Sequence, residues 1–317
     1  MNWIKKKVLN IGEKIKKVIR ERPSQKDILE SNWISCCDSS GPVLKEEIFN
    51  DETQHVCPKC NKHYPLTPKQ RFDYFFGKDN YTIIETPKAS EDPLRWPDGI
   101  YKKKLAAARK LTGQHCSVLV AQGIKDGINI TTFAIDSRFI GGSINVSSGE
   151  AIVKACQVAV DARNPLIAWS EGGGQSMFES NLSLHMMPKT VLAVNALKSN
   201  NLPFINCYVN KCYGGISASF AGISDVAFAE KSSMIGFAGQ FIVKNQTKEV
   251  LPEDFQTAES LLKTGFVDAV YNRKEINEKI MNILKILLHK YDASSEVNDE
   301  LTNETSENNQ SSREIAS

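Results

Sequence analysis

The chain has 317 residues, a formal net charge of +2, 41% hydrophobic residues and 24% charged residues. This composition is typical of a globular protein with one large domain or two ordinary ones. The small net charge argues against nucleic acid as the main partner, and the apolar runs are shorter than the ~18 residues of a membrane span. No apolar core of signal-peptide length follows the basic N-terminus, so we expect a cytoplasmic protein without a membrane span.

The two ends of the chain differ in composition from its middle. Residues 1–32 form a basic leader whose apolar side chains recur at helical spacing, namely Ile4, Val8, Ile11, Ile15 and Val18. Such an amphipathic helix suits a membrane surface or an acidic partner, and it equally suits a solvated helix packed on the main domain. Residues 293–317 are rich in Ser, Asn and Glu without an apolar period, so we predict a disordered tail.

Residues 33–64 predict a small zinc-ribbon-like module. Cys57-Pro-Lys-Cys60 has the spacing of a zinc knuckle, whose turn presents two thiolates to one tetrahedral face. We expect Cys37 to be a third ligand, but Ser40 stands where a ribbon would have its fourth cysteine, and a hydroxyl is a poor zinc ligand. The alternatives are a ribbon that has lost its metal, or a substitute ligand among Cys36, His55 and His63. Because the remaining cysteines are scattered singly, the pattern favours a reducing cytosol over a disulfide framework.

Residues 65–292 have the pattern of one large α/β domain. We expect 65–112 to form helices joined by polar connections. The predicted elements are a capped helix from Thr67, a helix over 98–112, a hairpin of 117–122 and 128–135, a helix from Ser147 to Asn164, strands over 225–229 and 233–239, and helices over 253–264 and 274–291. Short strands alternate with helices from 115 to 271, which predicts parallel pairing with right-handed crossovers.

The stretch 165–221 contains one unit twice: an apolar strand that ends in paired glycines, with a helix expected at once. The first strand ends at Gly173-Gly174 and the second at Gly214-Gly215. Glycine permits positive φ and close approach to bare N–H groups, and a helix start leaves further amides unpaired. We therefore predict two neighbouring cradles for negative charge developing on oxygen. A third pair, Gly141-Gly142, is expected to be structural, at a close crossing of strand and helix.

A set of short motifs follows in a fixed order along the chain. After the ribbon cysteines come Glu91-Asp-Pro-Leu, Tyr101-Lys-Lys-Lys-Leu, Ala108-Arg-Lys-Leu-Thr-Gly113, Phe139-Ile-Gly-Gly-Ser143, Gly149-Glu150, Gly173-Gly174, Met177, Gly214-Gly-Ile-Ser-Ala-Ser-Phe-Ala221, Ile235-Gly-Phe-Ala-Gly239 and Leu251-Pro-x-x-Phe-Gln256. No single motif is specific. Together, from about Trp33 to about Leu288, they resemble the β subunit of the acetyl-CoA carboxylase carboxyltransferase of bacteria and plastids.

The resemblance implies a crotonase-like ββα superhelix with an N-terminal zinc ribbon that binds Zn²⁺. It implies an α2β2 assembly with a separate α subunit of the same fold. The assembly moves a carboxyl group from carboxybiotin, tethered to a biotin carboxyl carrier protein, onto acetyl-CoA. The product is malonyl-CoA, in the first committed step of fatty acid biosynthesis.

Within that chemistry, the resemblance assigns the glycine pairs to oxyanion sites. Gly214 and Gly215 form the main site, facing a thioester or ureido oxygen, and Gly173 and Gly174 form a second cradle near the CoA thioester arm. Both developing charges lie on oxygen, and the ureido anion can itself take the methyl proton, so no protein base is required. His185 is accordingly expected to be an ordinary helical histidine.

Several side chains depart from the family pattern. Ser176 replaces an arginine, residues 210–213 read Asn-Lys-Cys-Tyr in place of Asp-Pro-Thr-Thr, and Phe241 stands where the family has arginine. The alternatives are therefore a carboxyltransferase for another acyl-CoA, or a weakened paralogue that binds a partner, or RNA through the ribbon. A basic run suits CoA phosphates or a solvated helix face, namely Lys102, Lys103, Lys104, Arg109 and Lys110.

Overall fold

The computed structural model describes residues 32–36, 41–247 and 250–289, and the chain divides into two compact units between Lys62 and His63. In the first unit, β1 (Trp33–Ser35) pairs antiparallel with β2 (Pro42–Leu44), and α3 (Lys45–Ile48) follows directly. The predicted leader, apart from residue 32, and the predicted tail lie outside the described residues.

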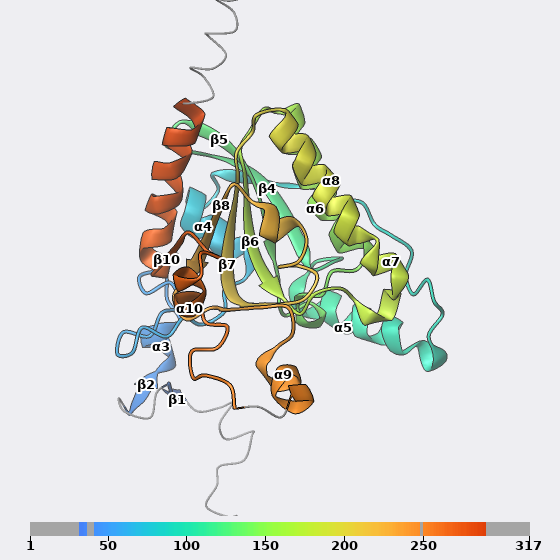
Figure 1. The fold of residues 1–317 in the computed structure, drawn as a ribbon, viewed down its shortest axis with the longest axis horizontal. Helices are drawn as coiled ribbons and strands as arrows, with labels where there is room; N and C mark the ends of the chain where they lie inside the picture. Colours follow the sequence, from blue (N-terminus) through green and yellow to red (C-terminus); the bar gives the residue numbers. More distant parts are fainter. Residues whose placement is uncertain (1–31, 37–40, 248–249, 290–317) are drawn as a thin grey trace, which may run out of the picture. The chain divides into compact units, whose positions relative to one another are not determined.

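The second unit is built on one sheet, shown in Figure 1, whose strands are neighbours both in the chain and in space. In spatial order the strands are β10 (Ala269–Tyr271), β8 (Val226–Glu230), β7 (Phe204–Cys212), β6 (Leu166–Gly172), β5 (Ile128–Ile135), β4 (Val118–Lys125) and β3 (Tyr81–Ile84), with β9 (Met234–Ile235) beside β7. Pairing is parallel from β5 to β10 and antiparallel at the β3–β4–β5 edge. The predicted α/β class, parallel pairing and hairpin are confirmed.

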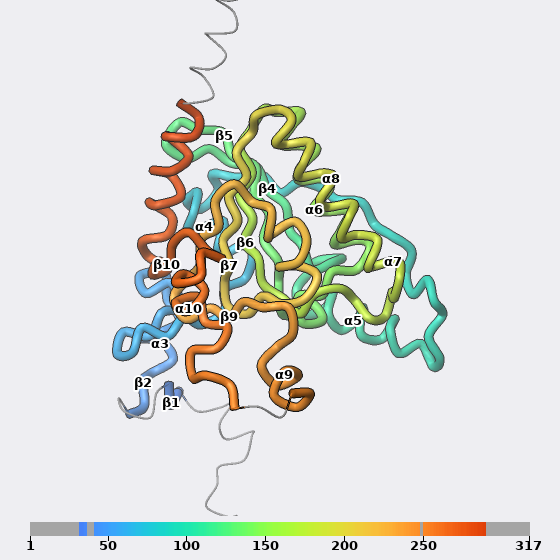
Figure 2. The backbone as a smooth tube through the Cα atoms, viewed as in Figure 1, coloured from blue at the N-terminus to red at the C-terminus, as the bar shows by residue number. Residues whose placement is uncertain are grey.

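Helices cover both faces of this sheet (Figures 1 and 2). On one face α6 (Val146–Asp161) and α8 (Met186–Ser199) bury small and branched side chains such as Ala155 and Val194 against the strands. On the other face lie α4 (Pro68–Phe76) and a helix over 273–289, with the Phe75 and Trp169 rings edge to face. Since β6 is buried at every position, it forms the centre of the unit.

Local sequence accounts for the main helix starts. Thr67 and Gln70 form a reciprocal capping box at the start of α4, with Pro68 as the first helical residue, and the Asn145 side chain accepts from Ser148 N at the start of α6. The remaining elements are η1 (Pro97–Gly99), α5 (Ile100–Thr112), η2 (Ile140–Gly142), η3 (Met177–Glu179), α7 (Asn181–Leu184), η4 (Phe220–Ile223), α9 (Gln240–Thr247) and α10 (Ala258–Lys263). Among the described helices, none is long and apolar enough to cross a membrane.

Three sequence-based expectations about elements are wrong. β3 lies within a region predicted to be helices and connections; it is a short edge strand with two exposed positions, so its pattern is weak. The helix predicted over 253–264 is confined to α10. No α-helix follows Gly215, because the Ser217 and Ser219 hydroxyls donate to the Gly214 and Gly215 carbonyls and compete with a helical ladder.

Candidate active site

The carboxyl ends of β5, β6, β7 and β9 meet at one edge of the sheet and are joined by backbone hydrogen bonds. Gly173 N donates to the Gly141 carbonyl at 3.1 Å, and Gly236 N donates to the Cys212 carbonyl at 3.1 Å. Tyr213 N donates to the Gly172 carbonyl at 2.9 Å. This edge is where ligands bind in α/β sheets.

The glycines allow these turns to touch. A Cβ on Gly172, where φ is +130°, would lie 2.4 Å from the Gly142 carbonyl oxygen, so neither turn leaves room for a side chain. A Cβ added to Gly214 would lie 3.3 Å from Gly174 Cα, so the two predicted cradles are in contact. The role predicted for Gly142, a close backbone crossing, agrees with this geometry.

The backbone amides of the two glycine pairs differ in their partners. Gly173 N donates to Gly141, and Gly214 N donates to the Phe237 carbonyl at 2.8 Å. Those two N–H groups are therefore engaged within the protein, and the prediction that they face an oxyanion is wrong for these donors. Within the described part of the chain, the N–H groups of Gly174 and Gly215 have no hydrogen-bond partner. These two N–H groups remain as candidate donors. They lie close together, because a Cβ added to Gly174 would be only 3.0 Å from Gly215 N.

The residues that depart from the family pattern lie in different surroundings. Ser176 is buried; its N–H donates to Ile144, and its carbonyl accepts from the Ser183 hydroxyl. Phe241, on α9, is 78% exposed. His185 is exposed and faces solvent between α7 and α8, as expected. Of the basic run, Lys102, Lys103, Lys104 and Lys110 are exposed on α5, and Arg109 pairs with Glu91.

Glu171 is a site residue that sequence reasoning missed. It lies at the end of β6, is 1% exposed, and accepts hydrogen bonds from Ser137 N and Asn210 Nδ2. Burial raises the pKa of its carboxyl group, against the attraction of Arg71 and the two hydrogen bonds. The available signal was a glutamate inside an otherwise apolar strand, because such a residue must find partners when it is buried.

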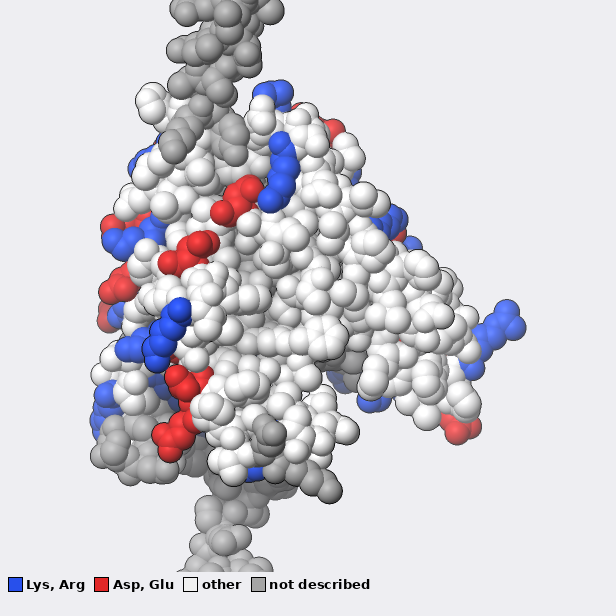
Figure 3. Space-filling view, in the orientation of Figure 1, with Lys and Arg blue, Asp and Glu red and all other residues white. Residues whose placement is uncertain are grey.

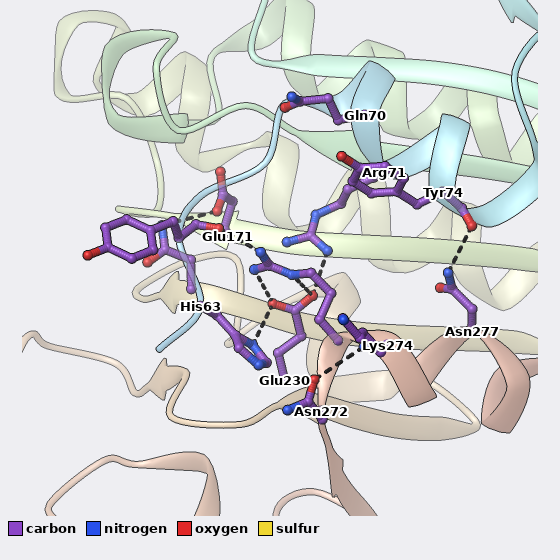
Figure 4. A network of polar contacts seen from close by, with 12 residues as sticks. His63, Gln70, Arg71, Tyr74, Glu171, Glu230, Asn272, Lys274 and Asn277 are labelled. Atoms are coloured by element: carbon purple, nitrogen blue, oxygen red, sulfur yellow. Dashed lines mark hydrogen bonds and ion pairs between the residues drawn. The ribbon is translucent and has the colours of Figure 1, made fainter. Parts of the chain in front are cut away.

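A second buried carboxylate, Glu230 at the end of β8, was also missed. Arg71 Nη1 donates to Oε1 at 2.8 Å and Arg273 Nη2 donates to Oε2 at 2.7 Å, while His63 Nδ1 lies 3.4 Å from Oε2 (Figure 4). Although burial opposes ionisation, the two guanidinium groups hold the pKa of Glu230 well below its usual range. These ion pairs join α4, β8 and the start of the 273–289 helix, so their position indicates a structural role.

The first unit holds a candidate metal site. The Sγ atoms of Cys36, Cys57 and Cys60 lie within 4.8 Å of one another, and those of Cys36 and Cys60 are 3.2 Å apart. The predicted ligand Cys37 and the neighbouring Ser40 lie outside the described residues, so Cys36, one of the substitutes considered, is the cysteine seen with the knuckle. Burial opposes ionisation of Cys57, but hydrogen bonds from the backbone of Cys60 and Lys59 and from the two thiols lower its pKa. This soft thiol set suits zinc.

The other two substitute ligands have different neighbours. The His55 ring packs edge-on against Phe49, with centroids 5.1 Å apart. His63 belongs to the second unit, where it faces Glu230.

Comparison with known proteins defines the class first. The carboxyl transferase domain family matches residues 99–316. Among solved structures, transcarboxylase 12S has a TM-score of 0.59 at 19% identity, covering 76% of this chain and 43% of that one. The Pseudomonas malonate decarboxylase hetero-dimer has a TM-score of 0.54 at 20% identity, covering 69% of this chain and 86% of that one. These likenesses show the crotonase-like carboxyltransferase fold.

Curated relatives identify the particular family. The acetyl-coenzyme A carboxylase carboxyl transferase subunit beta of Pelagibacter ubique is 44% identical over 320 residues, covering 100% of both chains. The subunit of the same name from Maricaulis maris is 37% identical over 84% of this chain and 85% of its own length. The chain belongs to the family of acetyl-coenzyme A carboxylase carboxyl transferase beta subunits, which confirms the resemblance drawn from its motifs.

Proposed function

We propose that this chain is the β component of a carboxyltransferase that moves a carboxyl group from carboxybiotin, on a biotin carboxyl carrier protein, to acetyl-CoA. The product is malonyl-CoA. Family membership supports the proposal, and so does the gathering of four strand ends at one edge of the sheet. The observation that carries it is the pair of unpartnered amides, on Gly174 and Gly215, in two turns that touch.

The proposed chemistry needs donors for charge on oxygen. Removing a methyl proton from acetyl-CoA puts negative charge on the thioester oxygen, and releasing the carboxyl group puts it on the ureido oxygen of biotin. The Gly174 and Gly215 N–H groups are fixed before the reaction, so they stabilise either charge without reorganisation. The N–H groups of Gly173 and Gly214, first predicted to be donors to substrate, instead hold the turns in place through their hydrogen bonds to the Gly141 and Phe237 carbonyls.

We propose that an α subunit docks beside these turns, in an α2β2 assembly. Three large apolar side chains there are highly exposed: Met177 at 85%, Phe237 at 73% and Phe241 at 78%. Phe237 belongs to the loop whose carbonyl holds Gly214 N, and α9 buries none of its residues. Figure 3 also shows few charges on the surface over α8. Exposed apolar groups of this size are typical of a protein interface.

We also propose a zinc ribbon in the first unit and a cytoplasmic location. Cys36, Cys57 and Cys60 would hold Zn²⁺ as thiolates, and the metal would fix the turn of the module. None of the cysteines that the structure describes is in a disulfide, which supports a reducing compartment. The zinc is structural in this proposal and takes no part in carboxyl transfer.

The test is co-expression with the α-type subunit of the same organism. The purified complex is assayed for malonyl-CoA-dependent carboxylation of a biotin analogue, and in the forward direction with acetyl-CoA and propionyl-CoA. We expect turnover with malonyl-CoA and acetyl-CoA. A stable complex that carboxylates no biotin analogue would refute the proposed activity. Preference for propionyl-CoA would instead favour another acyl-CoA as the substrate.

A further inference from the structure

β6 and β7 lose register immediately before the two glycine turns. Ser170 pairs with Tyr208 and Gly172 pairs with Cys212, so an advance of two residues on β6 matches four on β7. Asn210 lies in this bulge with φ of +54°, a conformation that asparagine adopts more readily than most residues. Bulges beside active sites re-aim side chains. Here the bulge directs the Asn210 amide toward Glu171 on the neighbouring strand.

The two oxygens of Glu171 hold two different strand ends. Oε1 accepts from the backbone N–H of Ser137, after β5, at 2.9 Å. Oε2 accepts from Asn210 Nδ2, on β7, at 3.2 Å. One buried carboxyl group therefore joins the ends of β5, β6 and β7. Glu171 lies three positions before Gly174, and Asn210 lies five positions before Gly215.

We infer that Glu171 is a positioning residue that sets the separation of the turns carrying the Gly174 and Gly215 amides. It acts through Ser137 and Asn210 and touches no substrate. Hydrogen bonds to a carboxylate are stronger than those between neutral groups, and they are directional, so they hold the turns to one geometry. The role of the two amides as oxyanion donors rests on the proposed function. The clamp, by which we mean the Glu171 carboxyl group with Ser137 N and the Asn210 amide, rests on the contacts alone.

The clamp works with Glu171 ionised, because both of its oxygens then accept. Facing it are Arg71 from α4, Arg138 after β5 and the Cys212 thiol on β7. The cations favour the carboxylate, while burial raises its pKa. A folded pKa above the unfolded one means that stability falls as pH rises through it. Replacing the carboxylate by a neutral isostere therefore removes the cost of burying its charged form while it weakens the clamp.

The experiment swaps the two groups. Glu171→Gln, Asn210→Asp and the double variant are made in the full chain and purified with the α-type subunit. At pH 8 we expect each single variant to lower kcat about tenfold or more with little change in KM. In Asn210→Asp the buried Glu171 carboxyl group faces a second, half-buried one, so kcat recovers as pH falls and the pair takes up a proton. In the double variant the new amide donates to the new carboxylate, and kcat returns toward the wild-type value.

Stability separates positioning from a plain packing role. We expect Glu171→Gln to keep the wild-type Tm at pH 8 although its kcat falls. Glu179→Gln, at a similarly buried carboxylate that binds Tyr101 and Val146 N instead, is the matched control. Adding Asn210→Asp to this control should rescue nothing. The inference is overturned if both single variants lose Tm and kcat together and the double variant restores neither.

A second readout needs no turnover. Hydrogen exchange measured on peptides covering 172–176 and 210–216 should accelerate in both single variants and slow again in the double variant. Unchanged exchange in the single variants would refute the clamp. If the wild-type complex transfers no carboxyl group, the proposed function fails, and the exchange result still decides the role of Glu171.

Discussion

Replacing Gly174 by alanine tests the proposed cradle most directly. Gly174 has φ of +98°, and a Cβ there would lie 3.0 Å from Gly215 N and 3.2 Å from the Tyr213 carbonyl oxygen. Both neighbours are backbone atoms, so neither can rotate away. Left-handed strain costs about 1–2 kcal/mol, and forcing the turns apart costs roughly 1–3 kcal/mol more. The sum is below the roughly 5–15 kcal/mol by which domains are stable. We therefore expect a folded protein with a displaced turn.

The expected loss in kcat is about 10²–10³-fold, the effect of removing one oxyanion donor. Gly127→Ala is the matched control, because φ there is +77° and no atom lies within 4 Å of the added Cβ, in the β4–β5 hairpin. It carries the same strain without the clash, so its complex should keep its turnover. Both variants are assayed for malonyl-CoA-dependent carboxylation of a biotin analogue, with Tm measured in parallel. Wild-type turnover in a folded Gly174→Ala complex would refute the assignment of Gly174 and Gly215.

Three further predictions concern metal, charge and surface. Cys57→Ser should lower zinc per chain, measured by elemental analysis, while the second unit keeps its unfolding transition; undiminished zinc would contradict the site. Glu230→Gln leaves Arg71 and Arg273 without their buried partner and should cost about 3–5 kcal/mol at pH 7 in urea unfolding. Because the folded pKa of Glu230 is depressed, this stabilisation is present above the unfolded pKa and is lost as pH falls toward the folded pKa. The unfolding free energies of the variant and the wild type should therefore converge in acid, and a difference that persists in acid would contradict the assignment. Phe241→Asp should leave the Tm of the isolated chain within a few degrees but weaken its association with the α-type subunit, measured by light scattering; undisturbed association would place the interface elsewhere.

The sequence predicted the parts of the fold that local rules govern. Thr67, Gln70 and Pro68 define the start of α4 by themselves, and the alternation around Gly127 defines the β4–β5 hairpin. The paired glycines located the strand ends correctly, since close backbone contact admits no side chain there.

The rest depends on contacts between distant segments. Which glycine amides are free is set by partners such as the Phe237 and Gly141 carbonyls, far along the chain from the glycines they bind. The bulge that brings Asn210 to Glu171 arises from strand register, which no spacing in one strand reveals. The buried group around Glu230 likewise draws on residues 159 and 43 positions away.

The order of the sheet has a consequence for synthesis of the chain. From β3 to β8 each strand pairs with the one made just before it, β9 then pairs with β7 and β10 with β8, so the sheet can grow in one direction as the chain leaves the ribosome. The last step differs, because Arg273 must bind Glu230, which already pairs with Arg71, and both of those residues are synthesised much earlier. Until it arrives, the Glu230 carboxylate has only one of its two arginine partners, and the apolar cluster around Phe75 lacks Ile276, Ile280, Met281 and Leu284. A nascent chain stalled before residue 273 would therefore be the form that needs a chaperone.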